Sequence, residues 1–154
     1  MKDKEIKIII QKLQNYCAYQ ERCTQEVIKK THIFTVDAAE IVTIIAALQE
    51  DKFLDEERFA CAFVRGKYQY QQWGRNKIVY ELKQKRVANS LIQLALKEIK
   101  EDTYEAIIVK LTELKYPDFP TISYEDKNKL IRYLLQKGYE LESIQRAWKN
   151  LSST

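Results

Sequence analysis

The chain has 154 residues, of which 45% are hydrophobic and 31% charged, and its formal net charge is +4 at pH 7. Three glycines and two prolines are few for this length, and helix-forming residues dominate, which predicts an all-α fold. No apolar run is long enough to span a membrane and nothing resembles a signal peptide, so we expect a cytoplasmic protein with no membrane contact.

Hydrophobic periodicity and capping residues predict nine helices along the chain. They are expected at about residues 4–20, 24–31, 37–50, 75–85, 89–100, 103–115 and 123–138, with a fourth that begins at Asp55 and a ninth that ends near 151. Asp37 and Asp55 can cap the third and fourth helices, and Glu40 can complete an Asp-x-x-Glu box with Asp37. The core-facing side of the fourth helix is expected to carry Phe59, Ala62, Phe63 and Tyr70.

The middle and the end of the chain are two copies of one helical unit. With a shift of 52 residues, segment 74–99 lies over segment 126–151, and nine of the 26 aligned positions are identical, Lys77/Lys129 and Lys85/Lys137 among them. A weaker third copy near the N-terminus repeats the apolar stripe of Ile41, Ile44, Ile45 and Leu48. The sequence therefore predicts three tandem three-helix repeats, 1–53, 54–101 and 102–154, in an elongated, slightly curved chain of nine helices.

One residue departs from the repeat at a position with a special backbone requirement. Arg86 aligns with Gly138, directly after the predicted end of a helix. Glycine there fits the left-handed conformation that commonly ends a helix, and an arginine can adopt it at a cost of about 1 kcal/mol. We therefore expect Arg86 to have a left-handed backbone.

The basic charge belongs to the middle repeat. Residues 60–100 carry nine bases and two acids, whereas residues 36–59 carry seven acids and two bases. Basic side chains can neutralise phosphates and exposed aromatic rings can stack on bases, so this segment favours contact with an acidic polymer or an acidic protein surface. Trp73 is also a candidate for the core, and we favour the core because large aromatic residues usually dominate it. The candidate contact residues are Arg65, Lys67, Tyr68, Trp73, Arg75, Lys77, Lys83, Lys85 and Arg86.

The sequence contains no recognisable catalytic or metal-binding constellation. There is no nucleophile paired with a histidine, no glycine-rich phosphate loop and no metal-ligand spacing. Three cysteines form no CxxC pair, and each is expected to be a small, mostly buried residue. We therefore expect a protein that is not an enzyme and that holds neither a metal nor a cofactor.

Several spaced motifs resemble the RecX family of bacterial recombination regulators, in a form similar to its Bacteroidetes branch. They are the segment 54–60 (LDEERFA), Phe63-Val64-Arg65, Trp73-Gly74, Lys77-Ile78-x-x-Glu81-Leu82-x-x-Lys85 and the closing segment 130–139 (LIRYLLQKGY). Arg86 stands where the family usually has glycine, and the link 31–36 is longer than usual. The resemblance covers nearly the whole chain and is clearest over residues 53–151.

The resemblance implies a non-enzymatic regulator that binds along RecA–DNA filaments and restrains RecA in homologous recombination and the SOS response; the repeat itself predicts a monomer. It also implies DNA binding, single- or double-stranded, which we expect to be weak and salt-sensitive. Two alternatives stay open from the residues alone. Segment 77–100 has the dimensions of a helix-turn-helix DNA-binding unit, although its second helix is very apolar. The chain could also be a helical adaptor for an acidic protein partner.

Overall fold

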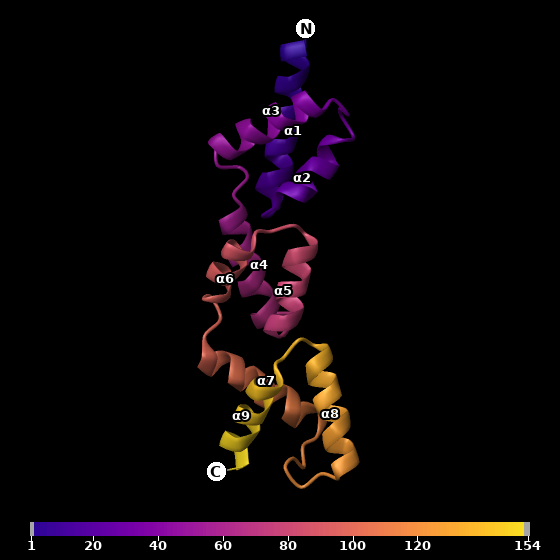
Figure 1. The fold of residues 1–154 in the computed structure, drawn as a ribbon, viewed down its shortest axis with the longest axis vertical. Helices are drawn as coiled ribbons and strands as arrows, with labels where there is room; N and C mark the ends of the chain where they lie inside the picture. Colours follow the sequence, from indigo (N-terminus) through magenta and orange to yellow (C-terminus); the bar gives the residue numbers. More distant parts are fainter. Residues whose placement is uncertain (1, 153–154) are drawn as a thin grey trace.

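The computed structural model describes residues 2–152, which form nine α-helices and no β-strand. The helices follow one another in three triplets, and these stack into a rod with the two termini at opposite ends (Figure 1). The sequence prediction of an all-α chain of three-helix repeats is confirmed. The helices are α1 (Lys2–Tyr19), α2 (Thr24–Thr31), α3 (Ala38–Glu50), α4 (Glu56–Gln69), α5 (Arg75–Gln84), α6 (Asn89–Leu96), α7 (Glu101–Lys115), α8 (Tyr124–Gln136) and α9 (Leu141–Ser152).

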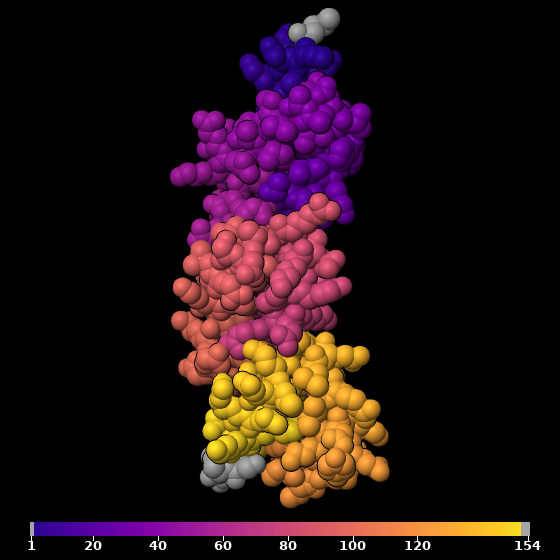
Figure 2. Space-filling view, viewed as in Figure 1, coloured from indigo at the N-terminus to yellow at the C-terminus, as the bar shows by residue number. Residues whose placement is uncertain are grey.

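Packing within each triplet defines three repeats: repeat 1 (α1–α3), repeat 2 (α4–α6) and repeat 3 (α7–α9). All the extensive helix–helix contacts of the described chain join helices of the same repeat. In repeats 2 and 3 the closest pairs are the first and third helices, α4 with α6 and α7 with α9. The space-filling view shows the three repeats as successive blocks of one column (Figure 2).

Local capping chemistry starts α3, α4 and α8. The Asp37 carboxylate accepts hydrogen bonds from two N–H groups of the first turn of α3 at 2.9 and 3.2 Å, and Asp55 accepts one at the start of α4 at 2.9 Å. Both predicted caps are confirmed. The predicted Asp-x-x-Glu box is wrong, because the Glu40 carboxylate accepts from the Thr35 hydroxyl at 2.7 Å instead of reaching back to Asp37. Ser123 caps α8 at 3.1 Å.

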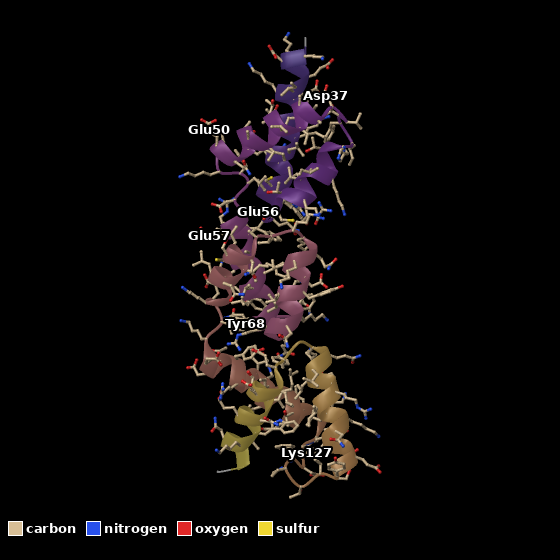
Figure 3. All side chains as sticks on the ribbon, viewed as in Figure 1. Asp37, Glu50, Glu56, Glu57, Tyr68 and Lys127 are labelled. Atoms are coloured by element: carbon tan, nitrogen blue, oxygen red, sulfur yellow. The ribbon has the colours of Figure 1, made fainter. Side chains whose placement is uncertain are left out.

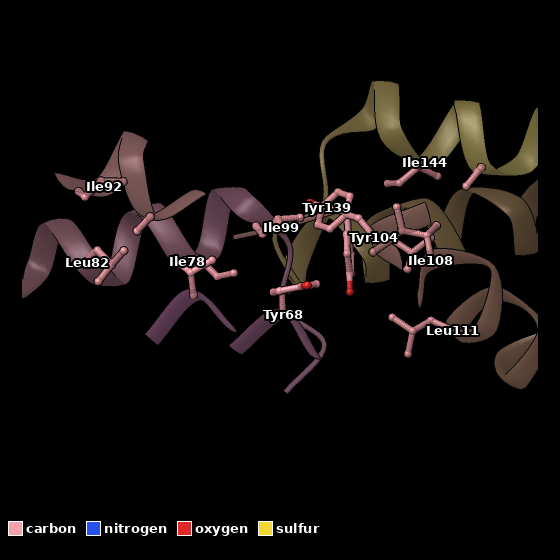
Figure 4. Packing of buried hydrophobic residues seen from close by; sticks show 14 of the residues in the cluster. Tyr68, Ile78, Leu82, Ile92, Ile99, Tyr104, Ile108, Leu111, Tyr139 and Ile144 are labelled. Carbon is pink, nitrogen blue, oxygen red and sulfur yellow. The ribbon is translucent and has the colours of Figure 1, made fainter. Parts of the chain in front are cut away.

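Two hydrophobic cores run through the rod. The first lies within repeat 1 and includes Leu13, Val27, Ile44 and Leu48. The second is continuous through repeats 2 and 3, and its buried side chains lie in one line across the boundary between them (Figure 4). Cys23, fully buried at the start of α2, packs into the second core. Repeats 2 and 3 therefore share one hydrophobic interior, whereas repeat 1 has its own.

The inward face of α4 differs from the predicted one at its end. Tyr68 is only 1% exposed, whereas Tyr70 is 82% exposed. Tyr70, the C-cap of α4, keeps a helical backbone and donates its N–H to the Gly66 carbonyl at 2.9 Å, so it continues the side of the helix on which Phe63 and Gly66 are only half-buried. The buried stripe of α4 is Phe59, Ala60, Val64 and Tyr68, with residues four apart along most of its length.

A backbone-to-backbone contact joins repeat 2 to repeat 3, and we call it the closed junction. The N–H of Gly74 donates to the carbonyl of Lys137 at 2.7 Å, and the N–H of Asn76 donates to the carbonyl of Gly138 at 2.9 Å. The C-terminal end of α8 thus satisfies N–H groups at the start of α5, and the two helix dipoles meet head to tail. A Cβ atom on Gly74 would lie 2.1 Å from the carbonyl carbon of Gly138, so this contact requires glycine.

Replacing Gly74 with alanine should lower the free energy of unfolding by about 3 kcal/mol or more, because rigid backbone atoms of Gly138 occupy the space. Urea denaturation monitored by circular dichroism measures the change. Gly66→Ala is the matched control. A Cβ at Gly66, inside α4, meets none of the described atoms within 4 Å, so alanine should raise stability by roughly 0.5–1 kcal/mol. Equal effects of the two substitutions would contradict the closed junction.

Arg86 has φ 61°, and Gly138 has φ 102°, so the left-handed conformation predicted from the repeat is confirmed. Arg86→Gly should therefore raise the free energy of unfolding by up to about 1 kcal/mol or leave it unchanged, because relief of strain is offset by greater unfolded-state entropy. Lys85→Gly is the control. Lys85 has φ −84°, so glycine there should destabilise the protein by roughly 1 kcal/mol. Thermal unfolding measures whether each substitution raises or lowers stability. A clear decrease in melting temperature with Arg86→Gly would contradict the inference that the left-handed backbone of Arg86 is strained.

Candidate functional site

Two candidate lysines, Lys67 and Lys77, lie over the aromatic ring of a third candidate residue, Trp73; we call this arrangement a stack. The Nζ atoms of Lys67 and Lys77 lie 4.6 and 4.4 Å from the Trp73 ring centroid. Trp73 is half-buried and meets Phe63 edge-on, with ring centroids 6.4 Å apart. The prediction that Trp73 is a core residue therefore holds for the side of the ring that packs inward. The ring also makes cation–π contacts with two lysine ammonium groups.

A second stack continues this surface into repeat 3. The Nζ atoms of Lys115 and Lys137 lie 3.8 and 5.9 Å from the Tyr133 ring centroid. Burial, and then the charge of Lys77, lower the pKa of Lys137. Two ammonium groups are thus held near each other across the closed junction, and an anion between them would relieve their repulsion.

We call this combined surface the cation–aromatic strip: Lys67, Trp73, Lys77, Lys137, Tyr133 and Lys115. The part of the strip in repeat 2 was predicted from the sequence, whereas Lys115, Tyr133 and Lys137 in repeat 3 were not. One available signal was the identity of Lys85 and Lys137 in the 52-residue repeat. None of the four lysines has an ion-pair partner within the described chain.

Two other candidate residues, Lys85 and Arg86, line hollows between repeats 1 and 2. Lys85 and Lys67 both line a hollow of about 440 Å³ with Phe59 and Phe63. Lys85 and Arg86 line a second one, of about 590 Å³, on α2 and the α5–α6 turn. Lys83 is exposed on α5. These cations remain accessible to a partner.

The prediction that Tyr68 contacts a partner is wrong, because Tyr68 is buried. Its side chain lies in the second core close to the closed junction (Figures 3 and 4), and only 1% of the residue is exposed. A ring in that position cannot stack on a ligand without unfolding α4. Its aromatic character serves packing.

Arg75 is also engaged inside the protein. Its guanidinium donates to Glu140 at 2.9 Å, forms a second ion pair with Glu101 and lies 4.2 Å from the Tyr104 ring centroid. The Tyr104 hydroxyl accepts from the backbone N–H of Arg75 and donates to Glu140. Burial and the hydrogen bond to Glu140 raise the pKa of Tyr104. Arg75 therefore helps to hold repeats 2 and 3 together, which contradicts its assignment as a contact residue.

Arg65 has a weaker internal partner. It lies 3.2 Å from a Glu98 carboxylate oxygen, and both side chains are more than a third exposed. Such a surface pair contributes little to stability, so Arg65 remains available for binding.

The described residues offer binding chemistry. No group of three or more His, Cys, Asp or Glu side chains in this part of the chain could hold a metal ion. Across the same residues, no helix combines the length and the apolarity that a membrane crossing requires. The described surface instead presents lysines paired with aromatic rings along a rod.

This architecture is that of a tandem three-helix repeat protein. Two family models match it: the second three-helix domain of RecX over residues 55–96 and the third three-helix domain over residues 102–148. The chain belongs to the RecX family.

Relatives agree with this assignment. The chain is 36% identical over 125 residues to "Regulatory protein RecX" of Clostridium botulinum, a match that covers 78% of this chain and 57% of the relative. It is 30% identical over 115 residues to the protein of that name from Yersinia enterocolitica, covering 75% and 68%. The chain thus spans little more than half the length of the clostridial relative.

Two crystal structures share the fold. RecX from Lactobacillus salivarius superimposes with a TM-score of 0.87 at 24% identity, over 99% of each chain. A second structure, titled regulatory protein RecX, gives a TM-score of 0.81 at 19% identity, over 93% of this chain and 72% of the other.

Replacing Arg75 with alanine should lower the free energy of unfolding by about 2–3 kcal/mol, because Glu140 and Tyr104 lose their half-buried partner. Arg65→Ala is the control with the same loss of charge. It removes an exposed pair and should cost at most about 1 kcal/mol. Chemical denaturation of both variants measures the difference, and equal costs would show that the Arg75 network is not structural.

Proposed function

We propose that this protein is a non-enzymatic regulator of RecA that binds RecA–DNA filaments and restrains RecA activity in homologous recombination and the SOS response. It would act in the cytoplasm as a monomer, without a cofactor. Family membership supports the proposal, because the relatives carry the name regulatory protein RecX. The structural observation that carries it is the cation–aromatic strip across the closed junction.

The chemistry of the strip suits the backbone of a nucleic acid or an acidic protein face. Its lysines have no carboxylate partner within the described chain, so binding a phosphate or carboxylate breaks no existing ion pair. Trp73 and Tyr133 hold lysine ammonium groups by cation–π contacts of about 0.5–1 kcal/mol each, which orders these side chains before a ligand arrives.

The shape of the molecule supports a filament as the partner. Repeats 2 and 3 share one core and a backbone contact, so the strip spans two repeats that are held rigidly together. Extended surfaces built from stacked repeats are suited to long partners. A rod with a basic line along it can follow a polymer that presents acidic groups at regular intervals.

The helix-turn-helix alternative is disfavoured by the packing of its would-be recognition helix. Helix α6 has eight residues, of which Ile92 and Ala95 are buried. Leu91 and Leu96 also pack against the second core. Half of the helix is therefore unavailable to base edges and its exposed positions carry no cation, so we assign DNA contact to the lysines of the strip.

Reversing the charge of Lys77 and Lys83 together should weaken binding to RecA–DNA filaments by about tenfold or more, because Lys77 belongs to the strip and Lys83 is exposed further along the same helix. Binding can be followed by light scattering or pull-down over a salt series. The native protein should lose affinity steeply with salt, and the double variant should show a shallower slope.

The matched control reverses Lys127 and Lys129, which belong to repeat 3; Lys127 lies toward the end of that repeat away from the closed junction (Figure 3). This pair should weaken binding less, with unchanged helical content in both variants. If the two pairs were equivalent, or if the Lys77 and Lys83 reversals were silent, the middle repeat would not be the recognition surface.

A further inference from the structure

The boundary between repeats 1 and 2 is an open counterpart of the closed junction. The 52-residue repeat aligns Arg86 with Gly138, and a side chain therefore stands where glycine permits backbone contact. No backbone hydrogen bond among the described residues joins the α5–α6 turn to α2. The helix ends instead leave a groove of about 590 Å³, which we call the open junction groove. Its lining includes Ile28, Lys29, Lys85, Arg86, Ala88 and Leu91.

The closed junction has a carboxylate, that of Glu140, at a repeat position where the open junction groove has the methyl group of Ala88. Glu140, directly before α9, accepts hydrogen bonds from Arg75 and Tyr104. The repeat aligns Ala88 with Glu140, and Ala88 is the N-cap residue of α6. Within the described chain the start of α6 has no side-chain cap. The first turn of α6 thus offers free N–H groups and the positive end of a helix dipole beside the groove.

The walls of the groove suit a ligand that is both acidic and apolar. Ile28 and Leu91 are partly buried and provide apolar surface. Three cations also line the groove, and none has an ion pair in the described structure: Lys29, Lys85 and Arg86. The acidic group of the lining, Glu56, accepts a hydrogen bond from the N–H of Thr24 at the start of α2, and Figure 3 shows it at the boundary between the repeats.

We propose that the open junction groove binds a short acidic segment of a partner protein. A carboxylate of that segment takes, at Ala88, the place that Glu140 takes in the closed junction, and an apolar side chain packs on Ile28 and Leu91. Charge complementarity with three unpaired cations selects an acidic segment over a basic or purely apolar one. The inference goes beyond the proposed function because it needs neither DNA nor a filament, although Lys85 and Arg86, which lie outside the cation–aromatic strip, are also candidate filament contacts.

The test measures fluorescence anisotropy of a short fluorescein-labelled peptide that alternates leucine with glutamate. The native protein should bind it saturably. Ala88→Glu should weaken binding about tenfold, because an internal carboxylate then occupies the position that the peptide needs, and tenfold corresponds to one charge-assisted hydrogen bond. Lys29→Glu, at an exposed position of the rim, should weaken binding similarly.

Ala46→Glu is the matched control, since it makes the same charge change at an exposed position of α3 and should leave peptide binding unchanged. A peptide with glutamine in place of glutamate should bind at least about tenfold more weakly. The proposal is overturned if the peptide does not bind the native protein, if Ala88→Glu and Ala46→Glu behave alike, or if the glutamine peptide binds equally. It is also overturned if single-stranded DNA displaces the peptide and loses affinity equally with Ala88→Glu. Filament binding by Ala88→Glu is measured separately, so a failure here leaves the proposed function standing.

Discussion

The contact between the backbones of Gly74 and Gly138 sets the geometry on which the working part of the rod depends. It lets the free carbonyls at the end of α8 accept hydrogen bonds from the free N–H groups at the start of α5 at 2.7 and 2.9 Å. With the helix ends this close, the second core continues from repeat 2 into repeat 3, and the Arg75 network encloses the junction. The lysines of the cation–aromatic strip then lie on one rigid body, although they come from two repeats.

Much of the fold could be predicted because its signals are local. The capping side chains of Asp37 and Asp55 predict where α3 and α4 start, and the 52-residue repeat predicts the left-handed conformation of Arg86. One failure concerns the face of α4: Tyr70 continues an apolar stripe in sequence, but the buried stripe runs through Val64 and Tyr68, and Tyr70 is exposed. Periodicity finds an apolar face of a helix, and the neighbouring helices decide which part of that face is buried.

The site was harder to predict because the availability of a cation depends on distant residues. Arg75 and Lys77 are two positions apart and equally basic in sequence. In the fold, Arg75 pairs with Glu140 and Glu101, whereas Lys77 has no ion pair in the described chain and lies over Trp73. Local charge counting cannot separate the two. The same holds for Gly74, whose requirement comes from Gly138, 64 positions further along the chain.

The two junctions show how one repeated unit acquires two uses. Gly138 and Glu140 follow α8, the second helix of repeat 3. They permit the backbone contact with the start of α5, which holds repeats 2 and 3 rigidly together. Where Arg86 and Ala88 stand in their place, the same helix ends leave a basic groove with an uncapped helix start. A rigid body presents its cations at fixed spacing, so the entropy of ordering them is lost on folding and not on binding. An open junction, in contrast, keeps unsatisfied N–H groups and unpaired cations together, and such groups gain most from a ligand that brings the missing carboxylate.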